Sequence, residues 1–370
     1  MVVKQAELSP EAHSETKPGG DPMDSMTYVG LDLHKRSVAY CVKTPSGRIV
    51  DEGTVLSSRA ALREWAQSLR TPWEGGMEAT LFTGWVYDLL LPYAAHLRVG
   101  HPLMLKAICC SKKKSDKIDA RKLADLVRSN LFPDCTMLPK ELRQLRRVLR
   151  FRNRIVRQAI RMKNTVCGLL MESGQAYSKR KLHGKRYFAE LLDSLEDVPE
   201  SVIELLNLSH GTLEFFTSMQ KKLIAGLRGQ PLLCERVDRL MTIPGVGEIT
   251  ALTWALEVGD PDRFGSVREA VSYCGLCSAY SESGGKERRG PISKQRNKYL
   301  QTVLIEASKI APQWNAELRA LRDRERMRGH HNRATLVVGR KLVAYLMAVD
   351  KRGTAFEDRA SRVGGEGLAA

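Results

Sequence analysis

Short apolar runs separated by polar bends fill the first part of the chain. Residues 28–33 form one run and residues 38–42 form a second, with a polar bend between them. Turn-forming residues at 44–47 lead into a third run at 48–56. Runs of this length that are joined by short polar bends are typical of neighbouring β-strands. The pattern therefore predicts three antiparallel strands in succession.

The following segments predict an alternation of helix and strand. Ser57 or Ser58 caps a helix whose apolar positions recur at helical spacing. Residues 74–82 then predict a fourth strand, residues 83–97 predict the helix behind it, and the apolar run 102–108 predicts a fifth strand before a last, polar helix. Strand, strand, strand, helix, strand, helix, strand, helix is the order of a ribonuclease-H-like α/β domain, which we expect here.

Four carboxylates stand on these predicted elements. Asp32 lies within the first strand and Glu78 lies on the fourth. Asp116 and Asp119 lie three residues apart on the first turn of the last helix, where they share a face. Magnesium prefers oxygen ligands, and two such ions about 3.5 to 4 Å apart stabilise the attacking and leaving oxygens of phosphodiester cleavage. We therefore expect all four acids to be catalytic and to hold Mg²⁺, with two ions in the site.

Each of these acids also has a structural interpretation when it is taken alone. A basic side chain can pair with Asp32, which is costly to bury unneutralised. Glu78 can simply end a strand, and Asp116 can face the dipole of its helix. Four acids in this order are much less easily accidental, so the sequence favours the metal site.

A long, basic, amphipathic stretch begins after Pro139. Between residues 140 and 163 the chain has ten Lys and Arg and one acid, while its apolar residues keep helical spacing. A second helical pattern at 202–227 is expected to fold back against it as a helical hairpin or coiled coil. Like charges this dense repel one another unless phosphates neutralise them, so nucleic-acid contact is favoured over a solvated face. The candidate contacts are Arg143, Arg146, Arg147, Arg150, Arg154, Arg157 and Arg161.

The last folded region carries two further patterns. Gly245 and Gly247 stand in a tight turn between two helical runs, the form of a helix-hairpin-helix, which offers backbone amides to a phosphate. An ordinary loop between helices has the same residues. Beyond this turn, a helix that ends around Gly275 and another that starts between Lys294 and Leu300 enclose a polar, glycine-rich loop.

Two serines of this loop are candidate nucleophiles. Ser281 and Ser283 precede Gly284 and Gly285. The basic residues that follow them are Lys286, Arg288, Arg289, Lys294 and Arg296. Such a serine can attack phosphorus while the cations stabilise the developing charge. The same loop can instead grip a phosphate without chemistry, and the residues alone favour that second interpretation.

Composition indicates a polyanionic partner. The 370 residues include 59 Lys and Arg against 42 Asp and Glu, which gives a formal net charge of +17 and a pI near 9.6. Nucleic acid is the partner expected from this charge. The sequence has no apolar run of 18 residues, and its amino end lacks a signal-peptide core, so we expect a soluble cytoplasmic protein.

The patterns divide the chain into five parts. We expect a flexible tail at 1–25, the α/β domain at 26–135, the basic helical hairpin at 136–230, a mainly α domain at 231–350 and a second flexible tail at 351–370.

Five segments carry motifs that are informative together. In order they read GLDLHKRSV, MEAT, KSDKIDARKLA, IPGVGEITA and YCGLCSAYSESGGKERRGPISKQRN. This set resembles the DEDD transposases of insertion sequence family one-hundred-and-ten, over residues 26–345. The resemblance implies a RuvC-like domain that carries the four acids, a helical coiled-coil segment, and a mainly α transposase domain whose serine forms a transient link to DNA. Ser283 matches the serine of the family because it directly precedes the glycines, and Ser281 stays as the alternative. Arg296 departs from the pattern, since many relatives have glycine there.

The resemblance implies a site-specific recombinase that excises and inserts its element through a circular intermediate. Its partners would be DNA at the element ends and the target and, as in several members, a structured guide RNA. Because the acids and the serine lie far apart in the chain, a composite site would require domain docking, for example between subunits of a dimer or tetramer. A prokaryotic, nucleoid-associated location follows from the same resemblance. The alternative interpretation is a metal-dependent junction-resolving nuclease whose serine loop only grips DNA.

Overall fold

The computed structural model describes residues 26–69, 72–108 and 115–357. The chain forms two compact units that divide after Lys140. The tail predicted at 1–25 lies outside the described residues, as does the second predicted tail from residue 358 onward.

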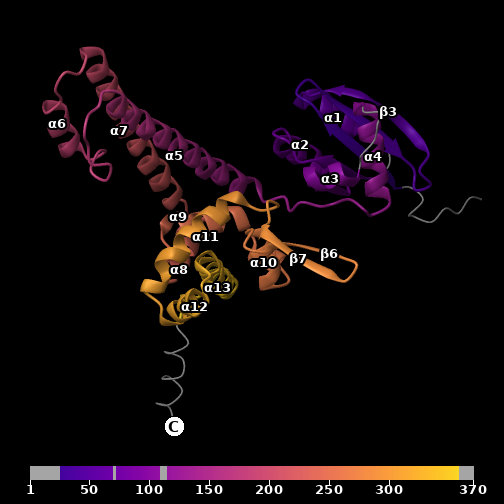
Figure 1. Ribbon diagram of the computed structural model, residues 1–370. Helices are drawn as coiled ribbons and strands as arrows, with labels where there is room; N and C mark the ends of the chain where they lie inside the picture. The colour runs from indigo at the N-terminus through magenta and orange to yellow at the C-terminus, as the bar shows by residue number, and fades with distance from the viewer. Residues whose placement is uncertain (1–25, 70–71, 109–114, 358–370) are drawn as a thin grey trace, which may run out of the picture. The chain divides into compact units, whose positions relative to one another are not determined.

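The amino-terminal unit is built on one sheet of five strands, in the order β3-β2-β1-β4-β5 (Figure 1). The strands are β1 (Thr27–Leu33), β2 (Ser37–Lys43), β3 (Ile49–Leu56), β4 (Trp73–Glu78) and β5 (His96–Gly100). The first three pair antiparallel, as the three apolar runs predict, whereas β4 and β5 continue the sheet parallel to β1. The α/β class expected for this part of the chain is confirmed.

Helices cover both faces of this sheet. They are α1 (Arg59–Ser68), α2 (Thr83–Leu90), α3 (Pro102–Ile108) and α4 (Asp116–Arg128). Leu62 of α1 and Val86 of α2 share a core with Val29 of β1. Ala120 of α4 packs instead against Cys41, whose side chain lies on the opposite face of the sheet. Helix α4, which carries the candidates Asp116 and Asp119, therefore lies on the face of the sheet opposite to α1 and α2.

Two predicted elements of this unit are wrong. The helix expected over 83–97 ends at Leu90, and after a single 3-10 turn (η2, Leu91–Tyr93) the chain forms β5. The run 102–108, expected as the fifth strand, is helix α3. Pro92 interrupts the helical hydrogen bonding, and apolar runs as short as 102–108 fit a strand or a helix equally well.

Two long helices lie side by side in the second unit (Figure 1). The helices of this half are α5 (Lys140–Glu172), α6 (Lys185–Asp193) and α7 (Glu200–Arg228). Val166 and Leu170, late in α5, share a core with Leu206, early in α7. At the other end, Leu149 and Leu227 belong to a different core, so the two helices run antiparallel. Both helices lie where the sequence predicts them.

The rest of this unit is a helical core around α9. Its helices are α8 (Cys234–Met241), α9 (Glu248–Val258), α10 (Val267–Tyr273), α11 (Lys298–Ile310), α12 (Ala316–Met327) and α13 (His331–Arg352), with 3-10 turns η3 (Pro261–Arg263) and η4 (Ala311–Gln313). Every residue from Thr250 to Val258 is buried, because helices that include α8 and α11 pack around α9. Among the described helices, none combines the length and apolar character needed to cross a bilayer.

The glycine-rich segment between α10 and α11 is a β-hairpin, so the loop predicted there is wrong. β6 (Ser278–Ser283) pairs antiparallel with β7 (Lys286–Ile292). Gly284 and Gly285 connect them with positive φ angles of 57° and 73°, the geometry of a type I′ turn. Polar and charged residues predominate in both strands, so no apolar alternation indicated the strands in the sequence.

The structured region continues past residue 350. Lys351 and Arg352 complete α13, and Gly353 ends it in the left-handed conformation, with φ 66°. The ring of Phe356 then packs 4.7 Å from the ring of Tyr345. The described part of the tail expected at 351–370 is thus held against α13.

Candidate functional site

Helix α4 lies directly on the sheet because the residues at the contact are small. A Cβ atom built on Gly30 of β1 would lie 1.9 Å from the carbonyl oxygen of Ala120 and 2.4 Å from the amide nitrogen of Ala124. Ala39 and Cys41 of β2 pack against the same two alanines. Only glycine therefore fits at position 30, and this close approach brings the first turn of α4 to the end of β1.

Ion pairs hold the helix at its flank. Glu52 of β3 accepts hydrogen bonds from Nε and a terminal nitrogen of Arg121, both at 2.7 Å, and Lys117 lies 2.6 Å away. These bonds lower the pKa of Glu52 to about 2. Lys43 of β2 donates to Asp125 at 2.6 Å. Two neighbouring strands thus fix the rotation of α4 about its axis.

Asp32 lies where β1 ends beneath α4. Only 16% of its side chain is exposed. Burial raises the pKa of Asp32, the ion pair with His34 opposes this rise, and the charges of Asp116 and Asp119 add to it. The carboxylates of Asp32, Asp116 and Asp119 thus lie close enough to repel one another. A cation bound among them would relieve this repulsion and would therefore be favourable.

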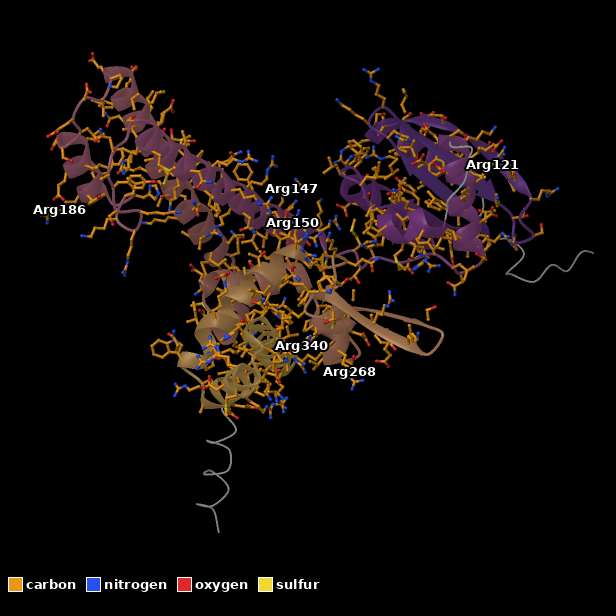
Figure 2. The ribbon with its side chains drawn as sticks, in the orientation of Figure 1. Arg121, Arg147, Arg150, Arg186, Arg268 and Arg340 are labelled. Atoms are coloured by element: carbon orange, nitrogen blue, oxygen red, sulfur yellow. The ribbon has the colours of Figure 1, made fainter. Side chains whose placement is uncertain are left out.

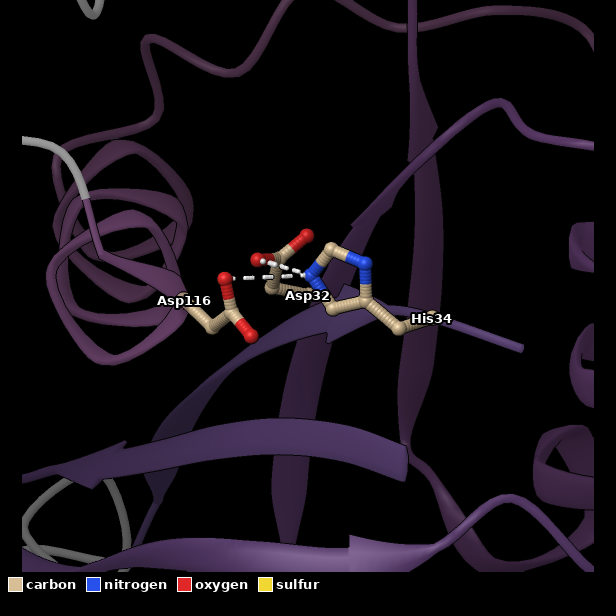
Figure 3. A group of neighbouring side chains, drawn as sticks. All are labelled: Asp32, His34 and Asp116. Carbon is tan, nitrogen blue, oxygen red and sulfur yellow. Dashed lines mark hydrogen bonds and ion pairs between the residues drawn. The ribbon is translucent and has the colours of Figure 1, made fainter. Parts of the chain in front are cut away.

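His34 stands between two of the predicted acids (Figure 3). Its Nε2 atom lies 3.0 Å from Oδ2 of Asp32 and 3.3 Å from Oδ1 of Asp116. Among the described residues, these three form the group whose donor atoms all lie within 4.8 Å of one another. Donor atoms about 2.1 Å from an ion on neighbouring octahedral positions are about 3 Å apart. The carboxylates and the imidazole therefore fit one divalent cation.

Glu78 and Asp119 lie beside this group without joining it. Met77 of β4 pairs with Leu31 of β1, so Glu78 is level with Asp32 on the neighbouring parallel strand. The hydroxyl of Thr83 donates to the backbone carbonyl of Glu78 at 2.8 Å. Asp119 is half-buried in the first turn of α4. The four acids expected from the sequence thus gather at one end of β1 and β4, and their roles as ligands stay predictions.

The sequence did not single out His34. It lies two residues after Asp32, and its backbone NH donates to the carbonyl of Ser37 at 2.9 Å in the bend between β1 and β2. Residues two apart along a strand share a face, which is the signal that could have paired His34 with Asp32. The polar bend HKR masked that signal because it reads as a simple turn.

Ser283 lies at the other candidate site, the tip of the β6–β7 hairpin. It is exposed, and across the two-glycine turn it pairs with Lys286, whose side chain is exposed as well. Directly opposed residues have Cβ atoms about 4.5 to 5.5 Å apart, so a cation flanks the serine. Ser281 pairs with Arg288 in the backbone register. The side chains of Ser281 and Arg289 lie outside the described ones.

A buried polar network ties the base of this hairpin to α5. Glu257 of α9 is fully buried and accepts two hydrogen bonds of 2.7 Å from Arg150 and one of 2.9 Å from the amide of Asn297. Asn297 also caps α11 by accepting from the backbone NH groups of Tyr299 and Leu300. Arg150, predicted from the sequence to contact nucleic acid, thus forms an ion pair with a buried carboxylate of its own chain.

Arg296 and Lys294 lie between the hairpin and α11. Arg296 donates to the backbone carbonyl of Ser293 at 3.0 Å, and its Cβ atom fills the space beside Gly275. Lys294 is exposed. Arg296 is therefore accommodated because Gly275, with φ 71°, has no side chain.

The remaining basic residues of α5 differ in exposure. Those that are exposed are Arg147, Arg154, Arg157 and Arg161, and no carboxylate of the described chain lies within ion-pair distance of them. Arg143 and Arg146 are half-buried, and burial together with the neighbouring Arg150 lowers the pKa of Arg146. Figure 2 shows the side chains of Arg147 and Arg150 on this helix.

The turn between α8 and α9 depends on Gly245. Its φ is 82°, and a Cβ atom there would lie 2.5 Å from that of Ala311. Gly247 precedes the first turn of α9 and has open space around it. The phosphate contact expected at this turn stays a prediction.

Comparison with known proteins gives the same family for both units. Residues 29–174 match the model for the DEDD transposases of IS110 elements, described as Transposase. Residues 237–322 match the model described as Transposase IS116/IS110/IS902 family. Together the matches cover more than half of the chain, and they include the four acids and Ser283.

Proteins of similar sequence are named as transposases. The transposase for insertion sequence element IS1328 of Yersinia enterocolitica is 24% identical over 341 residues, which covers 90% of this chain and 99% of that protein. A probable family 20 transposase of Pseudomonas aeruginosa is 28% identical over 229 residues, 59% of this chain and 67% of its own. The transposase for insertion sequence element IS1111A of Coxiella burnetii is 27% identical over 204 residues, 53% and 54% of the two chains. The chain therefore belongs to the IS110 family of DEDD transposases.

Proposed function

We propose that this transposase excises and inserts an insertion sequence by cutting and rejoining DNA with two sets of residues. Asp32, Glu78, Asp116 and Asp119 would hold the metal, and Ser283 would be the nucleophile. The observation that supports this most directly is the meeting of Asp32 and Asp116, from β1 and α4, in a chain whose residues 29–174 match the DEDD transposases.

The DEDD type of domain implies dependence on a divalent metal. We propose Mg²⁺, bound as two ions, because carboxylate oxygens predominate among the candidate ligands. Such ions stabilise the attacking and leaving oxygens of phosphodiester cleavage. Gly30 and the flanking ion pairs would hold α4, and with it Asp116 and Asp119, against the sheet beside Asp32.

Ser283 would attack the scissile phosphorus through Oγ. The new oxygen–phosphorus bond forms as the bond from phosphorus to a deoxyribose oxygen breaks, which leaves one DNA end linked to the protein. Lys286 stands opposite Ser283 and would stabilise the negative charge that develops on the phosphate oxygens. A hydroxyl released from another strand would reverse the reaction and rejoin DNA.

DNA would be gripped by exposed cations of the second unit. Arg147, Arg154 and Arg161 are seven residues apart, so they fall on one face of α5 and span about 21 Å at 1.5 Å per residue. The hairpin adds the exposed Lys286 and Arg288, the segment after it adds Lys294, and the turn before α9 adds backbone amides. Arg289 stays a candidate contact from the sequence alone. A structured guide RNA and a dimer or tetramer rest on the family resemblance.

A junction-resolving nuclease is the alternative. The exposed, lysine-flanked serine suits a loop that only grips a phosphate, while the acids do all the chemistry. The two functions differ in whether a covalent intermediate forms.

The test traps the full chain on a supercoiled plasmid that carries the element and searches for a phosphoserine-linked DNA adduct by mass spectrometry. We expect the adduct on Ser283, none with Ser283→Ala, and normal levels with Ser278→Ala, an exposed serine at the start of the same strand. Cleavage by Ser283→Ala at the wild-type rate would establish the nuclease. An adduct on Ser281 would move the nucleophile by two residues. Cleavage that survives Asp32→Asn would exclude the metal site.

A further inference from the structure

We propose that His34 is itself a ligand of the metal centre, through Nε2, so that the centre combines nitrogen and oxygen donors. This inference rests on the proposed function and adds to it a residue and a metal preference. The four acids of the family pattern do not include it.

The position of Nε2 is the first argument. This atom lies within 3.3 Å of an oxygen from each of two acids, Asp32 and Asp116, which come from different elements. A single N–H shared between two oxygens forms a three-centre hydrogen bond, in which neither contact is well directed. A cation among the three donor atoms would satisfy all of them: the two distances from Nε2 to the oxygens are near the spacing of neighbouring octahedral ligands, and all three atoms lie within 4.8 Å of one another.

The backbone around His34 is the second argument. Its NH is hydrogen-bonded to the carbonyl of Ser37, which closes the bend between β1 and β2. The Cα position is therefore fixed relative to Asp32, and only the side-chain torsions have to adjust. The side chain is 47% exposed, so an ion and its waters can reach the imidazole from solvent (Figure 3).

The chemistry of the donors gives the expected preference. Imidazole nitrogen suits transition metals better than it suits magnesium, and affinity rises from Mn²⁺ along the first-row series. Removing His34 should therefore weaken Mn²⁺ binding more than Mg²⁺ binding. For Mn²⁺ we expect a loss of about ten- to a hundredfold in affinity, the range seen when groups that support a metal site are removed.

The experiment reads the ligand directly. Full-length protein is loaded with Mn²⁺ and studied by electron spin-echo envelope modulation, which detects nitrogen bound to the ion. We expect nitrogen modulation in the wild type, its replacement by the ¹⁵N pattern when histidine is ¹⁵N-labelled, and its loss in His34→Ala. His96→Ala, which removes an exposed histidine at the start of β5, should keep the signal.

The outcomes separate this inference from the proposed function. Wild-type protein that binds Mn²⁺ through Asp32 but shows no nitrogen modulation would overturn the role of His34 and leave the carboxylate site intact. Equal Mn²⁺ binding by wild type and Asp32→Asn would instead overturn the site itself. The labelled wild type shows that a histidine binds the ion, and because the chain has eight histidines the assignment to His34 comes from the variants. His34→Gln provides a second variant without the ring, so the assignment does not depend on the folding of His34→Ala alone.

Discussion

Asp32 and Ser283 differ in how the chain holds them. Asp32 is mostly buried where α4 rests on β1, so the sheet, the helix and an imidazole all limit its movement. Ser283 stands at the exposed tip of a two-stranded hairpin. Backbone hydrogen bonds hold that hairpin to the core at its base. The NH of Ser293 donates to the carbonyl of Cys277, and the NH of Asn297 donates to the carbonyl of Tyr273.

This difference fits two different tasks. Donor atoms of a metal centre have to stay within about 0.5 Å of their working positions, which close packing achieves. A nucleophile that follows its phosphate through cleavage and rejoining benefits from a support with few buried contacts, which can move locally. Four changes to the chain break or sharpen this comparison.

The largest effect is expected at the base of the hairpin. Arg150→Ala would leave the buried carboxylate of Glu257 with Asn297 as its remaining side-chain donor. Losing one partner of a buried ion pair costs about 3 to 5 kcal/mol. We expect about 3 kcal/mol, because Arg150 is 41% exposed.

Urea denaturation of the full chain measures this loss. Arg147→Ala, one turn away on the exposed face, is the matched control, and its free energy of unfolding should change by no more than about 0.5 kcal/mol. Equal losses in the two variants would show that the network around Glu257 does not support the hairpin base.

The next effect is expected at the contact between α4 and β1. Gly30→Ala forces the helix off the sheet, since the new methyl group would overlap the backbone of Ala120. Overpacking of this kind costs about 1 to 3 kcal/mol, and we expect Mn²⁺ affinity to fall with it because Asp116 moves away from Asp32. Thermal unfolding and titration calorimetry measure the two quantities.

Gly168→Ala is the control for this change, because nothing lies within 4 Å of a Cβ atom at that position of α5. It should raise the free energy of unfolding by about 0.5 to 1 kcal/mol, because alanine is favoured over glycine inside a helix, and it should keep metal affinity. Unchanged metal binding in Gly30→Ala would show that the close approach of α4 is not what forms the centre.

A smaller effect is expected on DNA binding. Each phosphate contact contributes about 0.9 to the slope of log affinity against log salt. Arg147→Ala should therefore make this negative slope less steep by about 0.9. Arg150→Ala should leave the slope unchanged because Glu257 already neutralises the charge of Arg150. Fluorescence anisotropy with a labelled duplex over a range of salt concentrations gives the slopes. Equal slopes in wild type and Arg147→Ala would remove this face of α5 from the DNA contact.

The smallest effect concerns pH. The pKa of Glu52 is lowered from 4.5 to about 2 by Arg121 and Lys117, so its carboxylate stabilises the fold above pH 4.5 and this contribution is lost as the pH falls toward 2. Glu52→Gln should therefore be less stable than wild type at pH 7, with the difference shrinking across that interval. Glu64→Gln, an exposed glutamate of α1, should show no such convergence. A constant difference for Glu52→Gln would contradict the ion pairs.

The sequence predicts the surroundings of Asp32 better than those of Ser283. Asp116 and Asp119 are recognisable because a capped polar helix start carries both acids, and Asp32 because it interrupts an apolar strand. The close packing of α4 on Gly30 depends on Ala120, which lies 90 residues further along the chain. No local pattern in the sequence encodes such a contact.

The same reason explains why the sequence did not reveal the partner of Arg150 or the strands of the hairpin. Arg150 looks like its exposed neighbours in the sequence, and only folding brings Glu257, 107 residues away, against it. The β6–β7 hairpin has the two glycines of a tight turn, but its strands lack the apolar alternation that marks a buried face. Candidate residues that are marked by their local spacing can therefore be predicted from the sequence. Contacts between residues that lie far apart in the chain cannot.

Helix α5 belongs to two cores, one through Leu149 and the other through Val166 and Leu170. At 3.6 residues per turn, one residue inserted between them would rotate one core against the other by about 100°. Viable relatives should therefore lengthen or shorten this segment in steps of about seven residues, two full turns, which preserve the angular phase between the cores.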